Sequence, residues 1–304
     1  MARPKNSKTS KISKTTKAPR AVIGLIGGSG LYEMDGFKTE RAVTVRTPFG
    51  APSGPLTLGS LHGMDVAFLS RHGIGHRWSP SQINYRANIH AMKQLGVERI
   101  LSVSAVGSMK EAIHPGDLVV PDQFYDHTKG RRSTFFEDGI VAHVAFADPV
   151  CPVLTASLDA ACRRLGLTVH RGGTYLCMEG PQFSSRAESL IYRQWGVDVI
   201  GMTNATEAKL AREAEICYAT LALVTDYDCW HREEASVTVE AVVKILHENV
   251  AKAKRVLGAT IPALPQDRAC GCGEALRHAV ITAPTSVSAR AKTRVKALLS
   301  RRTT

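Results

Sequence analysis

Five short apolar runs, each followed at once by glycine or by polar residues, constrain the fold of this chain more than any other feature. The runs lie in the segments 21–30, 66–73, 99–108, 197–204 and 217–228. Apolar runs of this length that end in turn residues are typical of strands buried inside a sheet. The sequence therefore predicts at least five strands, each with polar or turn-forming residues at its carboxyl end.

Amphipathic segments fill the gaps between several of these strands. Apolar residues recur at helical spacing, and the segments that show this are 81–96, 155–166, 185–196, 207–215 and 240–257. Strands that alternate with helices predict an α/β fold in which helices cover both faces of one sheet. No internal repeat or linker interrupts residues 21–262, so we expect a single domain there and a partly helical C-terminal extension over 263–304.

The basic charge of the chain is concentrated at its two ends. The net charge is +12, but residues 1–20 hold seven Lys and Arg without an acid, and residues 285–304 hold six without an acid. Residues 21–284 are therefore close to neutral. The Lys/Ser/Thr-rich segment 1–20 is typical of a disordered, solvated tail. A near-neutral core without a basic-aromatic surface motif argues against nucleic acid as a partner.

The sequence shows neither an apolar segment that could span a membrane nor a pattern of cysteines typical of a disulfide framework. No apolar run approaches the ~20 residues that span a bilayer, and the seven cysteines are odd in number and scattered. That usage is typical of a reducing interior and predicts a cytoplasmic protein. Cys270-Gly-Cys272 is the exception, because a metal or redox role is conceivable there, but without a second pair nearby a plain loop is the favoured interpretation.

Several strand ends carry groups that suit an anion. The glycine-rich turn that contains Ser29 lets backbone N–H groups approach an anion closely. Arg71 offers a fork that suits phosphate oxygens, and His72 beside it offers another donor. The hydroxyl groups of Ser104 and Thr203 complete the set. Neither dedicated nucleotide motif occurs, so free phosphate is the predicted anion; a simple turn and a salt-bridged Arg71 remain the structural alternatives.

Two aspartates, Asp226 and Asp228, follow the last predicted strand. Residues i and i+2 of an extended chain point to the same side, so both carboxyl groups can face one ligand. Such a pair can bind a metal ion, act as the acid and base of a glycosidase, or bind an amine-bearing heterocycle. A metal is disfavoured because no His or further acid clusters nearby in sequence; the other two alternatives stay open.

The chain resembles the S-methyl-5′-thioadenosine phosphorylases, a family of the purine nucleoside phosphorylase superfamily, from about Ala21 to about Leu257. The blocks that carry the resemblance are "IGGSGLYE", "TPFGAPS", "LSRHGIGH", "PSQINYRANI", "AVGSM", "PGDLVVPDQFYDHT", "MEGPQFSSRAES", "MTNATEAKLAREAEICYA" and "TDYDCW". The resemblance implies a single α/β domain around a mixed, partly barrel-like sheet, assembled as a homotrimer. In one departure, Thr206 stands where relatives often carry proline.

The resemblance also implies a role for individual residues. Those that fall where the family binds phosphate are Ser29, Arg71, His72, Ser104, Ala105 and Thr203. Met202 falls at the ribose, Phe183 and Ser184 fall beside the purine, and Asp226 and Asp228 fall at its N7 and 6-amino group. His143, Val239 and Val242 fall around the 5′-methylthio group, and His143 is expected to reach the site of a neighbouring subunit.

The implied reaction is phosphorolysis of S-methyl-5′-thioadenosine to adenine and 5-methylthioribose 1-phosphate, in purine and methionine salvage. Phosphate is a co-substrate, and no cofactor or metal is expected. Asp226 is the implied general acid at N7, and burial together with Asp228 is expected to raise its pKa. The alternative is a methylthioinosine or purine nucleoside phosphorylase that acts on 6-oxopurines. Those enzymes tend to place asparagine after the threonine, where this chain has Thr225-Asp226, which favours adenine.

Overall fold

A mixed sheet forms the centre of the computed structural model, which describes residues 22–31, 34–231 and 239–300. Within these ranges the sheet has eleven strands. They are β1 (Ile23–Gly27), β2 (Phe37–Val43), β3 (Leu56–Leu61), β4 (Met64–Ser70), β5 (Arg99–Ser108), β6 (Leu118–Val120), β7 (Gln123–His127), β8 (Val169–Arg171), β9 (Thr174–Met178), β10 (Val199–Gly201) and β11 (Cys217–Asp226).

The strand order brings four parallel strands together in the middle of the sheet. β1 lies between β4 and β5, and β11 lies on the other side of β5, all parallel. Near its carboxyl end β5 also pairs antiparallel with β10, so the sheet divides there into one arm of β10, β9 and β7 and another of β11, β6 and β8. This branching is the form that the expected mixed, partly barrel-like sheet takes.

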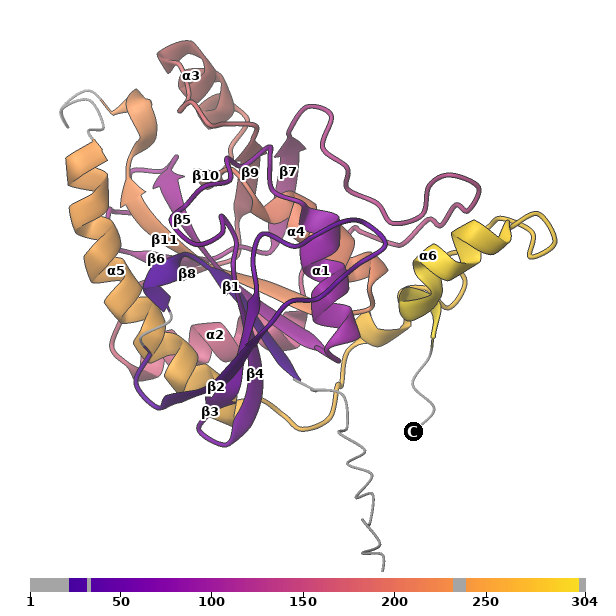
Figure 1. The fold of residues 1–304 in the computed structure, drawn as a ribbon. Helices are drawn as coiled ribbons and strands as arrows, with labels where there is room; N and C mark the ends of the chain where they lie inside the picture. The colour runs from indigo at the N-terminus through magenta and orange to yellow at the C-terminus, as the bar shows by residue number, and fades with distance from the viewer. Residues whose placement is uncertain (1–21, 32–33, 232–238, 301–304) are drawn as a thin grey trace, which may run out of the picture.

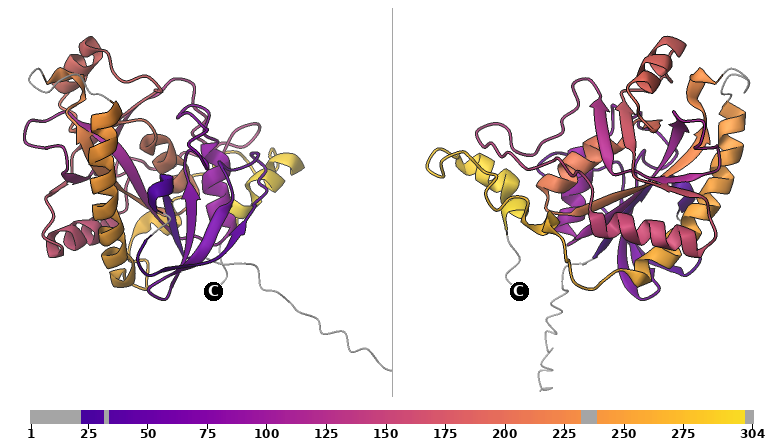
Figure 2. Two further views of the ribbon diagram at one scale, coloured as in Figure 1. Left: turned by 60° about the vertical axis from the view of Figure 1, so that its left-hand side comes forward. Right: turned by 180° about the vertical axis from the view of Figure 1, so that it is seen from behind.

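Helices cover both faces of the sheet, as the alternating pattern predicts. The α-helices are α1 (Tyr85–Gln94), α2 (Pro152–Arg164), α3 (Arg186–Gln194), α4 (Asn204–Glu213), α5 (Val239–Thr260) and α6 (Ala289–Leu299), and the short 3₁₀ turns are η1 (Ser29–Leu31), η2 (Asp228–Trp230), η3 (Ile261–Ala263) and η4 (Gly271–Glu274). Figures 1 and 2 show α5 on one side of the molecule and the C-terminal segment with α6 on the opposite side. No helix in the described part of the chain is long and apolar enough to cross a membrane.

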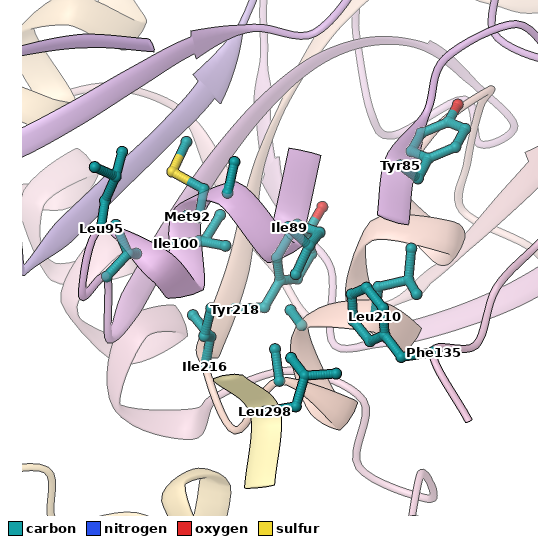
Figure 3. Close-up of a cluster of buried hydrophobic side chains, with 14 of the residues drawn as sticks. Tyr85, Ile89, Met92, Leu95, Ile100, Phe135, Leu210, Ile216, Tyr218 and Leu298 are labelled. Atoms are coloured by element: carbon teal, nitrogen blue, oxygen red, sulfur yellow. The ribbon is translucent and has the colours of Figure 1, made fainter. Parts of the chain in front are cut away.

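Successive residues of the central strands point into two different cores. Leu25 and Leu101 face the core under α2 and α5, whereas Ile26 and Ile100 face the core under α1, α4 and α6. Burial of both faces explains why these strands are continuous apolar runs without polar alternation. Figure 3 shows part of the second core, where Leu298 of α6 joins side chains from α1 and β5.

The predicted helices are all present, with shifted ends. The first begins at Tyr85 and not at residue 81, because the Asn84 side chain accepts the Ala87 N–H and caps the helix there. The predicted strand 197–204 is shorter than expected, because β10 ends at Gly201 and α4 begins at Asn204. The predicted tail 1–20 lies outside the described residues.

Candidate active site at the carboxyl ends of the central strands

The carboxyl ends of β1, β4, β5 and β11 meet at one edge of the sheet, where parallel strands place ligand sites. The Arg71 N–H donates to the Gly27 carbonyl oxygen at 2.9 Å and ties the end of β4 to the end of β1. Ala105 is the one exposed position of β5, whose other residues are buried. Ala105 is therefore accessible from the surface, next to residues that were predicted to bind phosphate.

Arg71 lies at this edge in a buried ion pair with Glu207 of α4. Its Nε and Nη2 donate to the two carboxylate oxygens of Glu207 at 2.5 and 3.1 Å, and both side chains are almost completely buried. Nη1 donates to the Val103 carbonyl oxygen and Nη2 to the Ser102 hydroxyl oxygen. Of the five N–H groups of an arginine, one on Nη1 is left for a ligand. The fork itself binds Glu207, which is the salt-bridged alternative that the sequence left open.

His72 is held in a single orientation beside Arg71. The Trp78 carbonyl oxygen lies 2.8 Å from Nδ1, so Nδ1 carries a proton and donates it, and the His76 ring stacks on the imidazole. Burial and the positive charge of Arg71 lower the pKa of His72 to about 4. The imidazole is therefore neutral near pH 7, with the lone pair of Nε2 free to accept a proton or a hydrogen bond.

A hydrogen-bond network through Ser102 joins Arg71 to two other residues that were predicted to bind phosphate, Ser104 and Thr203. The Asn204 amide nitrogen donates to the Ser102 hydroxyl at 3.3 Å, and its oxygen accepts from the hydroxyls of Thr203 at 2.9 Å and Tyr175 at 3.3 Å. The Tyr175 hydroxyl in turn lies 3.4 Å from the hydroxyl of Ser104. Arg71, Ser104 and Thr203, from three separate segments, therefore belong to one buried polar cluster.

Asp226 and Asp228 lie side by side, though not as residues of one extended strand. A register shift before Asp226 bends the end of β11, and Asp228 begins η2 with a φ of 54°. The Asp228 N–H donates to Asp226 Oδ1 at 2.8 Å, and the Thr225 hydroxyl donates to Oδ2 at 2.6 Å. A Cβ on Gly107 would stand 2.9 Å from Asp226 Oδ1. The pairing comes from this side-chain turn, and the absence of a side chain at Gly107 leaves space for it.

The carboxyl group of Asp228 has a raised pKa. Burial is the largest cause, and the negative charge of Asp226 adds to it, while the hydrogen bond from the Ser189 hydroxyl of α3 opposes it. The sequence predicted that burial and mutual repulsion would raise the pKa of Asp226. The structure shows a raised pKa at its neighbour Asp228, which belongs to η2 and lies beside α3; the raised pKa of Asp226 stays a prediction.

Comparisons with known proteins show the family to which this chain belongs. Residues 22–262 match the family model described as the phosphorylase superfamily. An S-methyl-5′-thioadenosine phosphorylase of Geobacter sulfurreducens is 56% identical over 91% of this chain and 98% of its own length. One from Koribacter versatilis is 56% identical over 92% and 96%. The chain belongs to the phosphorylase superfamily.

Solved structures of other superfamily members show the same fold. A methylthioadenosine phosphorylase from an Antarctic soil metagenomic library has a TM-score of 0.88 at 50% identity and covers 92% of this chain and 99% of its own. The methylthioadenosine phosphorylase of Schistosoma mansoni, in complex with adenine, has a TM-score of 0.78 at 36% identity and covers 82% and 93%. The fold that the sequence predicted is confirmed.

The remaining predicted residues of this superfamily member lie in several segments. Met202 precedes α4, and Phe183 is 60% exposed. The buried Ser184 donates to the sulfur of Met178, and its carbonyl oxygen accepts a hydrogen bond from Cys229, the residue after Asp228. His143 is exposed, and its N–H donates to the Ala279 carbonyl oxygen of the C-terminal segment. The side chains of Ser29, Val239 and Val242 lie outside the described part; in the backbone, Ser29 begins η1, Val239 begins α5, and Val242 lies in the first turn of α5.

Sequence reasoning missed the residues that support the predicted ones. The side chains that were predicted to bind phosphate are held by hydrogen bonds with Glu207, Asn204 and Tyr175. Ser189 contacts Asp228. Glu207 is the first residue of the helix predicted over 207–215, but no local pattern indicates that its carboxylate pairs with Arg71.

Proposed function

We propose that this protein catalyses the phosphorolysis of S-methyl-5′-thioadenosine to adenine and 5-methylthioribose 1-phosphate. The observation that carries the proposal is the pair Asp226 and Asp228 at the same sheet edge as the polar cluster around Arg71 and Thr203. The aspartate pair suits a purine, and the polar cluster suits an anion. A reaction between a nucleoside and phosphate requires both. The activity of relatives that are 56% identical over nine-tenths of the chain supports the same conclusion.

In this proposal phosphate binds among Ser29, Arg71, His72, Ser104, Ala105 and Thr203. Arg71 contributes one N–H of Nη1 and a charge that Glu207 partly balances, so its main effect is electrostatic. His72 Nε2 accepts a hydrogen bond from the single proton of the phosphate dianion, because Nδ1–H is already donated to Trp78. This hydrogen bond orients the dianion, and one of its unprotonated oxygens attacks C1′ of the ribose. No cofactor or metal takes part.

Asp226 acts as the general acid at N7 of the purine, and Asp228 lies toward the 6-amino group. The Thr225 hydroxyl has a single hydrogen and two acceptors within reach, Asp226 Oδ2 and the Val106 carbonyl oxygen at 3.2 Å. When the hydroxyl donates to Val106, its own oxygen can accept a proton held on Oδ2. Thr225 thereby accommodates both forms of Asp226, ionised and protonated, which an acid that cycles between them needs.

We also propose a homotrimer in which each subunit supplies His143 to its neighbour, and a cytoplasmic location. His143 is exposed, and among the described residues only its backbone N–H binds the C-terminal segment, so its side chain is available to contact a neighbouring subunit. Exposed apolar side chains gather on β7 and α3, where the rings of Tyr125 and Trp195 lie 5.3 Å apart. A patch of this kind suits burial against another subunit.

A substrate panel tests the function. Methylthioadenosine, methylthioinosine, adenosine and inosine are each incubated with and without phosphate, and base release is measured. We expect methylthioadenosine with phosphate to react fastest, and adenosine to have a kcat/KM about ten- to thirtyfold lower, the difference that burial of one methylthio group makes near Val239 and Val242. A preference for methylthioinosine would favour the 6-oxopurine alternative, and equal rates without phosphate would indicate a hydrolase.

A further inference from the structure

Four cysteines from three separate parts of the chain meet at one point in the structure. Cys151 precedes α2, Cys217 begins β11, and Cys270 and Cys272 belong to the C-terminal segment around η4. Their four sulfur atoms all lie within 4.8 Å of one another. The second cysteine pair that the sequence lacked near Cys270-Gly-Cys272 is therefore supplied by residues 119 and 53 positions away from Cys270.

The spacing of these sulfur atoms suits a tetrahedral metal site. Cys270 Sγ lies 3.4 Å from Cys217 Sγ and 3.7 Å from Cys151 Sγ. A zinc ion with four Zn–S bonds of about 2.3 Å separates its ligand atoms by about 3.8 Å. A disulfide needs an S–S bond of about 2.05 Å, and none of the seven cysteines forms one in the described residues.

The cluster is largely enclosed by protein. Three of the four cysteines are buried, and the cluster borders the apolar core under α2 and α5. A cation bound among the four sulfur atoms would stabilise all of them as thiolates in this environment.

The cluster lies where the C-terminal segment joins the domain, far from the candidate active site. Arg99, the neighbour of Cys217 on β5, donates to the carbonyl oxygens of residues 265–267, and Arg268 donates to that of Glu215. These bonds bring the backbone before Cys270 onto the amino ends of the strands. Cys217 and Asp226 are the two ends of β11, which puts them about 30 Å apart.

We propose that Cys151, Cys217, Cys270 and Cys272 bind one zinc ion, as four thiolates, at a structural site that fastens the C-terminal segment to the domain. Four sulfur ligands in a tetrahedral arrangement select a thiophilic cation such as zinc over magnesium or calcium. The site takes no part in the reaction, because it has no open coordination position and lies at the opposite end of β11. Its effect is on stability.

Metal content and thiol counting test the proposal on the full-length protein, purified without chelator or reductant. We expect about one zinc per chain by plasma mass spectrometry, released by a mercurial reagent. After denaturation in EDTA without reductant, all seven cysteines should react with a thiol reagent. Seven reactive thiols without bound metal would overturn the proposal in favour of packed free thiols, and three or five would overturn it in favour of disulfides.

Paired variants locate the site. Cys270→Ser with Cys272→Ser should lower the zinc content at least tenfold, whereas Cys162→Ser, which removes a buried thiol outside the cluster, should leave it unchanged. Because the double variant could fail to fold, the wild type is also stripped with chelator. Its melting temperature should fall and should recover with zinc but not with magnesium. Zinc retained in the double variant, or a melting temperature that zinc does not alter, would contradict the assignment.

Discussion

Asp226 and Asp228 share one turn but differ in their surroundings. Asp226 is held by Thr225 and by a backbone N–H, at the edge where the surface opens beside β5. Asp228 accepts a hydrogen bond from Ser189 of α3, and burial raises its pKa. Side chains in such different environments are suited to different tasks, so the two aspartates should respond differently to the same substitution.

Asp226→Asn keeps the shape of the side chain but removes its proton chemistry. We expect kcat for methylthioadenosine to fall about a hundredfold or more, the effect of losing a general acid, while the nucleoside still binds within a few-fold. The residual activity should shift toward methylthioinosine. Asp228→Asn is the matched control and should mainly change the choice of base. Melting temperature and kcat are measured on the same preparations, and an Asp226→Asn enzyme that melts early but turns over normally would contradict the assignment.

Asp228→Asn should also reveal the raised pKa through stability. An acid whose folded pKa lies above its unfolded value destabilises the fold as the pH rises between the two values, and the loss persists above them. Asparagine does not ionise, so the variant should melt above the wild type at pH 7. The difference should vanish near pH 4, close to the unfolded pKa. Asp65→Asn, at an exposed position, is the control; a gain that is equal at both pH values would rule out ionisation as the cause.

The role of a single residue could be predicted where its own side chain and the local sequence indicated it. The role could not be predicted where it depended on a partner far away in the sequence. Arg71 and Thr203 were identified because each follows an apolar run. The engagement of Arg71 by Glu207 joins residues 136 positions apart, and no local pattern encodes that contact. The same limit applies to the cysteine cluster, because its members lie in three separate segments.

The first turn of α4 carries a buried hydroxyl without a partner. Thr206 is fully buried, and its Oγ1 has no hydrogen bond among the described residues. Thr206→Val keeps the shape and removes the unpaired group, so it should raise the free energy of unfolding by about 1 kcal/mol. Thr220 is equally buried but accepts a hydrogen bond from Asn204 at 2.7 Å, so Thr220→Val should lower stability by about 1–3 kcal/mol. Urea denaturation measures both, and a loss of stability in Thr206→Val would show that the hydroxyl has a partner.

Helix α6 contributes buried side chains to the hydrophobic core. Leu298 is completely buried among side chains from α1 and α4, whereas Leu299 beside it is 41% exposed. Leu298→Ala should therefore cost about 2–5 kcal/mol of unfolding free energy, and Leu299→Ala should stay within about 0.5 kcal/mol of the wild type. Both are measured by urea denaturation. Equal small effects would mean that α6 does not pack on the domain in solution.

Elements were predictable where the apolar pattern was strong. The central strands and the five predicted helices satisfy that condition, and all were found. β2 was missed because it lies at the sheet edge and most of its residues are exposed and polar. β6 and β8 have three residues each, too few to show a period. Such strands form because neighbours already in place offer hydrogen bonds, which a local pattern cannot reveal.

At the scale of the whole molecule, the two ends of the sheet have different roles. The carboxyl ends of the central strands hold the polar cluster and the two aspartates, and the amino end of β11 holds the cysteines and receives the C-terminal segment. The candidate active site and the attachment of the C-terminal segment therefore lie at opposite ends of β11. This arrangement follows from parallel strands, which place all their carboxyl ends at one edge.

The stoichiometry of the reaction tests the proposed function most directly. Methylthioadenosine is incubated with the enzyme and limiting phosphate, adenine is followed by absorbance, and the phosphorus products are followed by nuclear magnetic resonance. We expect one 5-methylthioribose 1-phosphate for each adenine released, and no further adenine once phosphate is exhausted. Adenine release that continues without phosphate and yields free methylthioribose would contradict phosphorolysis and assign the strand-end site to a hydrolase.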